Sequence, residues 1–297
     1  MTIFNLGSIN TDYIYEVPHL PRPGETLAAT GFGFGLGGKG ANQSVAAAQA
    51  GSAVIHIGAV GADGGWAKKR LADYGVDVRH IAETDIATGH AIVCVDRAAE
   101  NAIVVFAGAN MAQAETAITA ALGQGKAGDL LLLQNETSHQ VFAARLAHEK
   151  GMKVFYSAAP FSVDATASLL PYLSILALNS LEADQFSAGL ETNLSDLGLP
   201  GILVTRGADG AEWHAGKNVI TSPAIPVEPV DTTGAGDTFA GYFAASIDQG
   251  IAPQRALRLA TESPFAVQHG RQRHAVDVRR RYECRGSSDL RGIVRTP

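Results

Sequence analysis

Apolar residues along this chain fall into short continuous runs that alternate with segments of helical spacing. A continuous apolar run bounded by glycine or polar residues predicts a strand that is buried on both faces. Runs of this kind occur at residues 3–6, 52–61, 130–134, 153–157, 173–178 and 201–205. Helical spacing is found at residues 62–74, 138–150 and 181–186, and again after Gly236. This alternation predicts an α/β fold with three layers, α/β/α, in which right-handed crossovers join a mostly parallel central sheet.

Three other segments depart from this rhythm. Residues 88–96 and 101–106 flank a turn and predict a β-hairpin, and residues 26–34 predict a short strand. Residues 31–42 carry glycine at almost every second position, which is typical of a backbone that must approach a small ligand closely. We expect a helix to start near Gln43, after this stretch.

Composition narrows the class of protein. The chain has 297 residues, of which 46% are hydrophobic and 18% are charged, which predicts a soluble globular protein with a large core. The formal net charge of −6 argues against a nucleic-acid partner. No apolar run approaches membrane-spanning length, and the nine histidines are too scattered to predict a structural zinc site. Two cysteines, Cys94 and Cys284, imply no disulfide framework and favour a reducing cytoplasm.

The richest candidate for chemistry is the stretch from residue 228 to 243. Gly234, Ala235 and Gly236 stand where a helix begins, and their small side chains leave its unpaired backbone amides open to an anion. Asp237 follows in the first turn, where the helix dipole keeps a carboxylate ionised. An ionised carboxylate next to an anion-binding site can take a proton from a hydroxyl while the amides stabilise charge on a phosphate. By itself, however, this short motif is equally consistent with a capped helix.

The glycine-rich stretch contains two deceptive patterns. Its glycines fit a dinucleotide-binding fingerprint, but no buried strand leads directly into them. They also imitate a phosphate-binding loop, but Gly40 stands where a serine or threonine must hold magnesium. We therefore favour a site for a small polar ligand, with Lys39 and Asn42 as hydrogen-bond donors.

Polar residues follow several of the predicted strands. Asn10 and Asp12 come soon after the first strand, although a simple turn explains them equally well. Glu136, Asn179 and Thr205 follow or end three later strands. Ligands of α/β proteins gather at the carboxyl ends of the strands, so these side chains are expected to converge.

Two long motifs give a family resemblance. Asp-Thr-Thr-Gly-Ala-Gly-Asp-Thr-Phe, at residues 231–239, resembles the C-terminal signature of the ribokinase family, the phosphofructokinase-B-type carbohydrate kinases. Gly-Gly-Lys-Gly-Ala-Asn-Gln, at residues 37–43, is similar to the sugar-binding segment of that family. The hairpin also resembles the family's lid. The resemblance covers residues 3 to about 260 and implies a single ribokinase-like kinase domain over residues 1–297, with a small β lid from about 10–40 and 88–108.

The resemblance also implies a role for individual residues. Asp237 matches the catalytic base, and the backbone of residues 234–236 matches the anion hole. Matches to sugar-binding positions are Asn10, Asp12, Gly38, Lys39, Asn42 and Glu136. Matches to nucleotide-binding positions are Asn179, Thr205 and Gly207, while Glu182 matches a carboxylate that acts on Mg2+ through water. Asp231 and Thr233 match residues that bind K+.

Together these matches imply an ATP-dependent sugar kinase of the cytoplasm that uses Mg2+ and K+. The implied reaction transfers the γ-phosphoryl group to a primary hydroxyl, with D-ribose as the leading substrate and ribose 5-phosphate as the product. A homodimer through the lid strands is expected, because the edges of an exposed sheet need protection. Two alternatives stay open: a kinase for a nucleoside or another sugar, and a sugar-binding relative without catalysis.

The resemblance stops near residue 270. Residues 271–297 contain eight arginines and no lysine, where the family has a small glycine-rich loop that completes the potassium site. Two interpretations stay open for this atypical tail: a divergent genuine terminus, or an out-of-frame reading of the gene. Either interpretation leaves the adenine pocket and the potassium site without their expected sequence.

Overall fold

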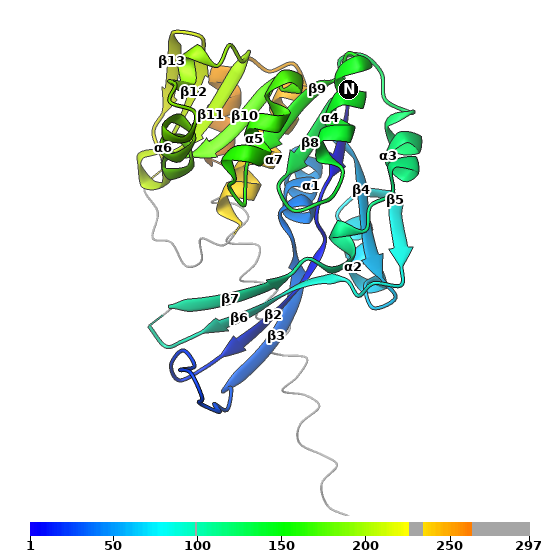
Figure 1. Ribbon diagram of the computed structural model, residues 1–297, viewed down its shortest axis with the longest axis vertical. Helices are drawn as coiled ribbons and strands as arrows, with labels where there is room; N and C mark the ends of the chain where they lie inside the picture. The colour runs from blue at the N-terminus through cyan, green and yellow to red at the C-terminus, as the bar shows by residue number, and fades with distance from the viewer. Residues whose placement is uncertain (99, 226–233, 263–297) are drawn as a thin grey trace, which may run out of the picture.

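The computed structural model describes residues 1–98, 100–225 and 234–262. A nine-stranded sheet lies at the centre, in the order β13-β12-β11-β10-β9-β8-β1-β4-β5 (Figure 1). Its strands are β1 (Thr2–Leu6), β4 (Ala53–Gly61), β5 (Asp77–Thr84), β8 (Leu130–Gln134), β9 (Lys153–Ser157), β10 (Ile175–Asn179), β11 (Gly201–Thr205), β12 (Ala211–Ala215) and β13 (Asn218–Ser222). Neighbouring strands are parallel from β5 across to β11, and the β11–β12 and β12–β13 pairs are antiparallel. The predicted α/β fold with a mostly parallel sheet is confirmed.

Helices cover both faces of this sheet. They are α1 (Lys39–Gln49), α2 (Gly65–Asp73), α3 (Glu115–Leu122), α4 (Gln140–Glu149), α5 (Val163–Leu169), α6 (Ser180–Gly189) and α7 (Ala235–Asp248), with short 3-10 turns η1 (Gly108–Met111), η2 (Leu170–Tyr172), η3 (Leu194–Asp196) and η4 (Gly207–Asp209). Residues 253–262 are also helical. The buried residues form two clusters, one on each face of the sheet. One cluster includes residues of α1, α2, α7 and 253–262, and the other includes residues of α3 to α6. The three predicted layers are therefore present.

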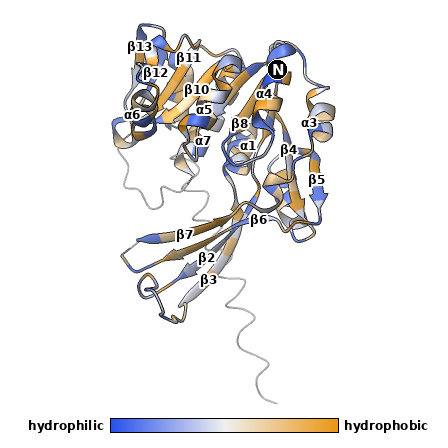
Figure 2. Ribbon diagram, viewed as in Figure 1, coloured by the Kyte–Doolittle hydropathy of each residue, from blue (hydrophilic) through white to orange (hydrophobic). Residues whose placement is uncertain are grey.

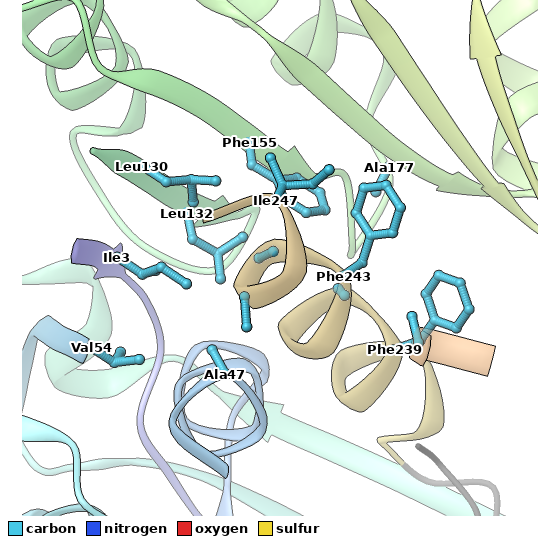
Figure 3. Packing of buried hydrophobic residues seen from close by; sticks show 14 of the residues in the cluster. Ile3, Ala47, Val54, Leu130, Leu132, Phe155, Ala177, Phe239, Phe243 and Ile247 are labelled. Carbon is cyan, nitrogen blue, oxygen red and sulfur yellow. The ribbon is translucent and has the colours of Figure 1, made fainter. Parts of the chain in front are cut away.

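The central strands are apolar on both sides because helices cover both sides. All five residues of β8 are buried, as expected for a strand in a doubly covered parallel sheet. Figure 2 shows this as a band of hydrophobic strands through the middle of the domain. On one face, Phe243 of α7 packs edge-on against Phe155, with ring centroids 6.2 Å apart. Figure 3 shows α7 between the sheet and Ala47 of α1.

Helices α1 and α7 pack unusually closely. Gly241 lies on the face of α7 that meets α1, and a Cβ atom added there would lie 2.6 Å from the Gln43 carbonyl oxygen and from Ala46 Cβ. Those distances are too short for any side chain, so glycine permits the contact. The contact brings the first turns of both helices together.

A second, four-stranded sheet projects from the domain (Figure 1). Its strands, in the order β3-β2-β6-β7, are β2 (Asn10–Glu16), β3 (Gly31–Gly37), β6 (Gly89–Val95) and β7 (Asn101–Phe106). We call it the lid sheet. Tyr13, Phe34, Ile92 and Val104 stand in register across its four strands and share one face, while Asp12 lies on the other.

The structure corrects several element boundaries. The strand expected at residues 26–34 lies at Gly31–Gly37, and α1 begins at Lys39, earlier than expected near Gln43. The glycines of β3 alternate with Phe32, Phe34 and Leu36, so this stretch has the two-residue period of a strand. Sequence analysis did not assign α3, α5, β2, β5, β12, β13 or the helix at residues 253–262, most of which are short or only weakly periodic. Within the described ranges, no helix has the length and apolar composition needed to cross a bilayer.

Candidate active site

The carboxyl ends of β1 and β8 define the place where a site is expected. β1 lies between β4, which follows it in the chain, and β8, which comes much later. Connections therefore lead away from β1 and β8 in opposite directions, and such a switch point opens a crevice at the carboxyl edge of the sheet. Gly7 and Ser8 follow β1 at this edge, and Asn135 and Glu136 follow β8.

Asp237 lies at the start of α7, in the position that the sequence predicted. Gly234 is the N-cap of this helix, with a left-handed φ of 73°, and Thr238 N–H donates the first helical hydrogen bond to its carbonyl, 2.9 Å away. The amides of Ala235, Gly236 and Asp237 precede that first bond, so they have no acceptor within the helix. Asp237 is buried, with 9% of its surface exposed.

Two consecutive residues of α1 hold the Asp237 carboxylate. Asn42 Nδ2 donates to Asp237 Oδ2 at 3.1 Å, and Gln43 Nε2 donates to Asp237 Oδ1 at 3.1 Å. Asn42 was expected to bind sugar, and it is partly exposed at the carboxylate. Gln43 is fully buried. Each carboxylate oxygen thus receives a hydrogen bond from a different side chain.

The predicted sugar residues Gly38, Lys39 and Glu136 lie together next to this carboxylate. Glu136 Oε2 accepts hydrogen bonds from the Ser8 hydroxyl and, at 3.1 Å, from the Lys39 backbone N–H. Burial raises the pKa of Glu136, and the negative charge of Asp237 acts in the same direction, while the Ser8 hydrogen bond and the Lys39 charge oppose them. The two carboxylates and the lysine therefore lie close enough to influence one another electrostatically.

Gly38 makes the turn between the lid sheet and α1. Its φ is 91°, and a Cβ atom there would lie 2.8 Å from the Ser8 carbonyl oxygen and 2.9 Å from the Asn10 nitrogen. Only glycine combines this conformation with so close an approach. The turn places Lys39 at the crevice immediately after β3.

Asn10 and Asp12 lie where β2 leaves the domain. Asn10 Oδ1 accepts from Asn110 Nδ2 at 2.8 Å, and Asn110 also accepts from the Ile9 backbone N–H at 2.8 Å. The carboxylate of Asp12 lies directly over Gly37, the last residue of the neighbouring strand β3. A Cβ atom added to Gly37 would overlap this carboxylate. Both residues therefore lie at the junction between the crevice and the lid sheet.

The nucleotide-binding candidates occupy the neighbouring part of the same edge. Asn179 ends β10 and stands in register with Thr205, which ends β11, while Gly207 begins the next turn. Asn179 Oδ1 accepts from Glu182 N–H at 2.9 Å, and Glu182 Oε2 accepts from Asn179 N–H at 2.8 Å, so both residues form a capping box for α6. Burial raises the pKa of Glu182, while the Asn179 hydrogen bond and the Lys39 charge lower it. The Lys39 charge therefore acts on both Glu136 and Glu182.

The described residues do not include all of the predicted ion ligands. Asp231 and Thr233 lie outside the described residues, as does the tail from residue 271 to 297. Among the residues that are described, no group of three or more His, Cys, Asp or Glu side chains could hold a metal ion.

Sequence reasoning missed four residues that build this site. Ser8, Gln43, Asn110 and Gln134 are buried and hydrogen-bonded to site residues or to one another. Gln43 lies within the motif at residues 37–43, and Gln134 is a polar residue at the end of a buried apolar strand. That polar strand end was the signal available in the sequence. Their partners lie far away in the chain, and no local pattern indicates them.

Comparisons with known proteins find similar sequences over most of the chain. The model of the pfkB family carbohydrate kinases matches residues 2–271, which ends where the arginine-rich tail begins. Over 273 residues, the chain is 34% identical to a ribokinase of Haemophilus influenzae, covering 86% of this chain and 89% of the relative. It is 31% identical over 259 residues to a deoxyribokinase of Salmonella typhi, covering 82% of this chain and 85% of the relative.

Solved structures show the same fold. A ribokinase of Arabidopsis thaliana complexed with ribose and ATP superposes with a TM-score of 0.74 at 28% identity, covering 88% of this chain and 89% of the other. A nucleoside kinase of Burkholderia thailandensis in complex with inosine has a TM-score of 0.75 at 20% identity, covering 89% and 92%, and shows the fold alone. The ribokinase-like fold is therefore confirmed, and the chain belongs to the pfkB family carbohydrate kinases, which are ATP-dependent.

Proposed function

We propose that this kinase transfers the γ-phosphoryl group of ATP to a primary hydroxyl of D-ribose, giving ribose 5-phosphate. The observation that carries the proposal is the convergence of Asp237, Lys39, Asn42 and Glu136 at the switch point of the sheet. A small polyhydroxylated ligand is the kind of molecule that such a set of charged donors and acceptors can bind. Identities of 31% and 34% to relatives that act on pentoses support the same substrate class.

In the proposed reaction Asp237 is the general base. The sugar hydroxyl oxygen attacks the γ-phosphorus, its proton passes to the Asp237 carboxylate, and the bond between γ-phosphorus and the bridging oxygen of ADP breaks. The amides at the start of α7 point toward the phosphoryl group and stabilise its charge. Gly234, Ala235 and Gly236 carry no long side chain that would block this approach.

Asn10, Asp12, Gly38, Lys39, Asn42 and Glu136 are proposed to bind the sugar. Asn10 and Asp12 approach from β2 of the lid sheet, and the others from the crevice, so the ligand would lie between the two parts. A site whose buried polar groups hydrogen-bond every hydroxyl discriminates strongly against a sugar that lacks one.

Asn179, Thr205 and Gly207 are proposed to bind the nucleotide, with Mg2+ neutralising its phosphates. Magnesium in such kinases keeps several waters and needs only one or two protein carboxylates. Glu182 fits that role, because the capping box engages only its Oε2 atom and the side chain stays partly exposed. A potassium ion held by Asp231 and Thr233 is proposed on the sequence motif alone.

We further propose that the protein is a cytoplasmic homodimer joined through the lid sheet. Phe32, Phe34, Ile92, Val104 and Phe106 are all at least 40% exposed, and registers place them on one face of that sheet. An exposed apolar face of this kind marks an interaction surface, and a second copy of the same face would cover it symmetrically. The reducing environment is supported by the low cysteine content.

A coupled ADP-release assay with ribose, 2-deoxyribose, hexoses and nucleosides tests the substrate. We expect ribose to have the highest kcat/KM and 2-deoxyribose a lower one, because the missing hydroxyl leaves buried partners unpaired. Nucleosides that are turned over faster than ribose would favour a nucleoside kinase. Ribose binding without any turnover would favour a sugar-binding relative that has lost catalysis.

A further inference from the structure

A chain of buried side chains leads from Asp237 into the interior of the domain, and the proposed reaction does not use it. We propose that Gln43, oriented by Gln134, is a positioning residue that fixes the Asp237 carboxylate and keeps it ionised. This inference rests on the proposed role of Asp237 as the base. It assigns a function to two side-chain amides that have no part in the proposed binding of sugar or nucleotide.

The two glutamines form the first part of the chain. Gln43 Nε2 donates to Asp237 Oδ1 at 3.1 Å, and Gln43 Oε1 accepts from Gln134 Nε2 at 2.8 Å. Both glutamines have no exposed surface. Because α1, α7 and β8 each supply one member, the contact joins two helices of one layer to the sheet at the switch point.

The second part of the chain holds Gln134 in its orientation. Gln134 Nε2 also donates to Asn5 Oδ1 at 3.0 Å, and Asn5 Nδ2 donates to Ser44 Oγ at 2.8 Å and to the Gly40 carbonyl at 2.8 Å. Ser44 Oγ lies 2.8 Å from His56 Nδ1. His56 Nε2 lies 3.1 Å from the Gly7 carbonyl oxygen, which can only accept.

The two ends of this hydrogen-bonded chain of side chains determine the direction of the hydrogen bonds between them. At one end an ionised carboxylate can only accept, so Gln43 must present its NH2 group to Asp237. Gln43 Oε1 then requires the NH2 group of Gln134. At the other end the Gly7 carbonyl oxygen can only accept, so His56 must donate from Nε2. Burial lowers the pKa of His56 to about 4, so the imidazole is neutral and its Nδ1 accepts from the Ser44 hydroxyl.

A fixed polarity has a chemical consequence for the base. Gln43 cannot rotate its amide to present Oε1 to Asp237 without losing the Gln134 hydrogen bond inside the core, where an unpaired polar group is costly. Hydrogen bonds to the charged form of a carboxylate lower its pKa. Gln43 therefore favours the ionised form and holds Oδ1, while partly exposed Asn42 contacts Oδ2 on the substrate side.

The test compares three variants of the full-length protein. Gln43→Met keeps the size of the side chain and removes its donor, and Gln134→Met removes the group that orients Gln43. Each should lower kcat with little effect on either KM and move the acidic limb of the pH–kcat profile upward by about one unit, the size expected for one lost hydrogen bond to a charge. Gln43→Glu should move the limb further, because two adjacent carboxylates raise one pKa strongly.

Ser52→Ala is the matched control. Ser52 Oγ donates to Asp248 Oδ2 at 2.9 Å, so this variant also removes a buried hydrogen bond to a carboxylate of α7, but at the far end of the helix. It should lose stability comparably and leave the pH profile in place. An acidic limb that stays at its wild-type position in Gln43→Met and Gln134→Met would overturn the proposal and leave the glutamines a purely structural role.

A second measurement does not depend on turnover. Carboxyl 13C NMR of aspartate-labelled protein, with the Asp237 signal assigned by its absence in Asp237→Asn, reports the pKa of that carboxyl directly. The Asp237 titration should move upward in both methionine variants and remain unchanged in Ser52→Ala. If the wild type phosphorylates no sugar, the proposed function fails, while this titration still decides whether the glutamines control the carboxylate. An unchanged titration in the methionine variants refutes the positioning role.

Discussion

The buried imidazole of His56 makes the stability of this protein depend on pH in a predictable direction. His56 has no exposed surface, and burial lowers its pKa from 6.5 to about 4. An unfolded chain would bind a proton near pH 6.5, while the folded protein resists protonation until near pH 4. The stability that the neutral imidazole contributes is therefore complete above pH 6.5 and is lost as the pH falls through about 4.

The size of the effect follows from the difference between the two pKa values. A difference of about 2.5 units corresponds at most to roughly 3 kcal/mol, because one unit equals about 1.4 kcal/mol. At pH 5, where the unfolded histidine is almost fully protonated and the folded one is not, we expect a loss of about 2 kcal/mol relative to pH 7.5. That amount is a large fraction of the usual free energy of unfolding.

Urea unfolding followed by tryptophan fluorescence, repeated between pH 7.5 and 5, measures this loss. His56→Gln keeps an acceptor for Ser44 and a donor for the Gly7 carbonyl but cannot titrate. The variant should lose about 2 kcal/mol less than the wild type over that range. Buried groups whose pKa is raised, such as Glu136 and Asp248, act in the opposite direction, but they are common to both proteins and cancel in the comparison.

His148→Gln is the control, because His148 is an exposed histidine at the end of α4. Its unfolding free energy should follow the wild-type pH dependence. Equal pH dependence in the wild type and in His56→Gln would refute the reasoning, since a buried neutral imidazole must resist protonation.

Three further outcomes are expected from the proposed mechanism and assembly. Asp237→Asn should lower kcat by about two to four orders of magnitude, the range for loss of a general base, with sugar and ATP affinity little changed; a variant that keeps a tenth of the wild-type turnover would exclude Asp237 as the base. Replacing potassium by sodium at constant ionic strength should reduce activity if Asp231 and Thr233 bind the ion, and equal rates in the two salts would contradict that site. Val104→Asp places a charge on the exposed face of the lid sheet and should give a monomer in sedimentation experiments, whereas an unchanged dimer would place the interface elsewhere.

The sequence alone determined the fold class and the place of Asp237 at the start of a helix. Continuous apolar runs such as residues 130–134 predicted buried parallel strands, because a strand covered by helices on both faces must be apolar throughout. The motif at residues 231–239 predicted a carboxylate, Asp237, at a helix start, and the structure has α7 begin at Ala235. These features depend on local spacing, which the chain displays directly.

Local spacing was less informative for residues 31–42, where an alternating strand pattern coincides with a high glycine content. Residues 31–42 were expected mainly to bring backbone close to a ligand, yet their first part forms β3 of the lid sheet. The alternation of glycine with phenylalanine has a strand period, but glycine disfavours regular structure by itself. Pairing with β2 decides the outcome, because Gly37 leaves the space that the Asp12 carboxylate occupies.

Only the tertiary structure decided which side chains surround Asp237. Gln43 and Asp237 are separated by 194 positions, and Gln43 and Gln134 by 91, yet all three side chains meet in one buried chain of hydrogen bonds. Their meeting requires the order of strands at the switch point and the close approach of α1 to α7 at Gly241. A glutamine at a helix start or a strand end carries no sign of such a partner, because the donor that it needs comes from a distant segment that only folding places beside it.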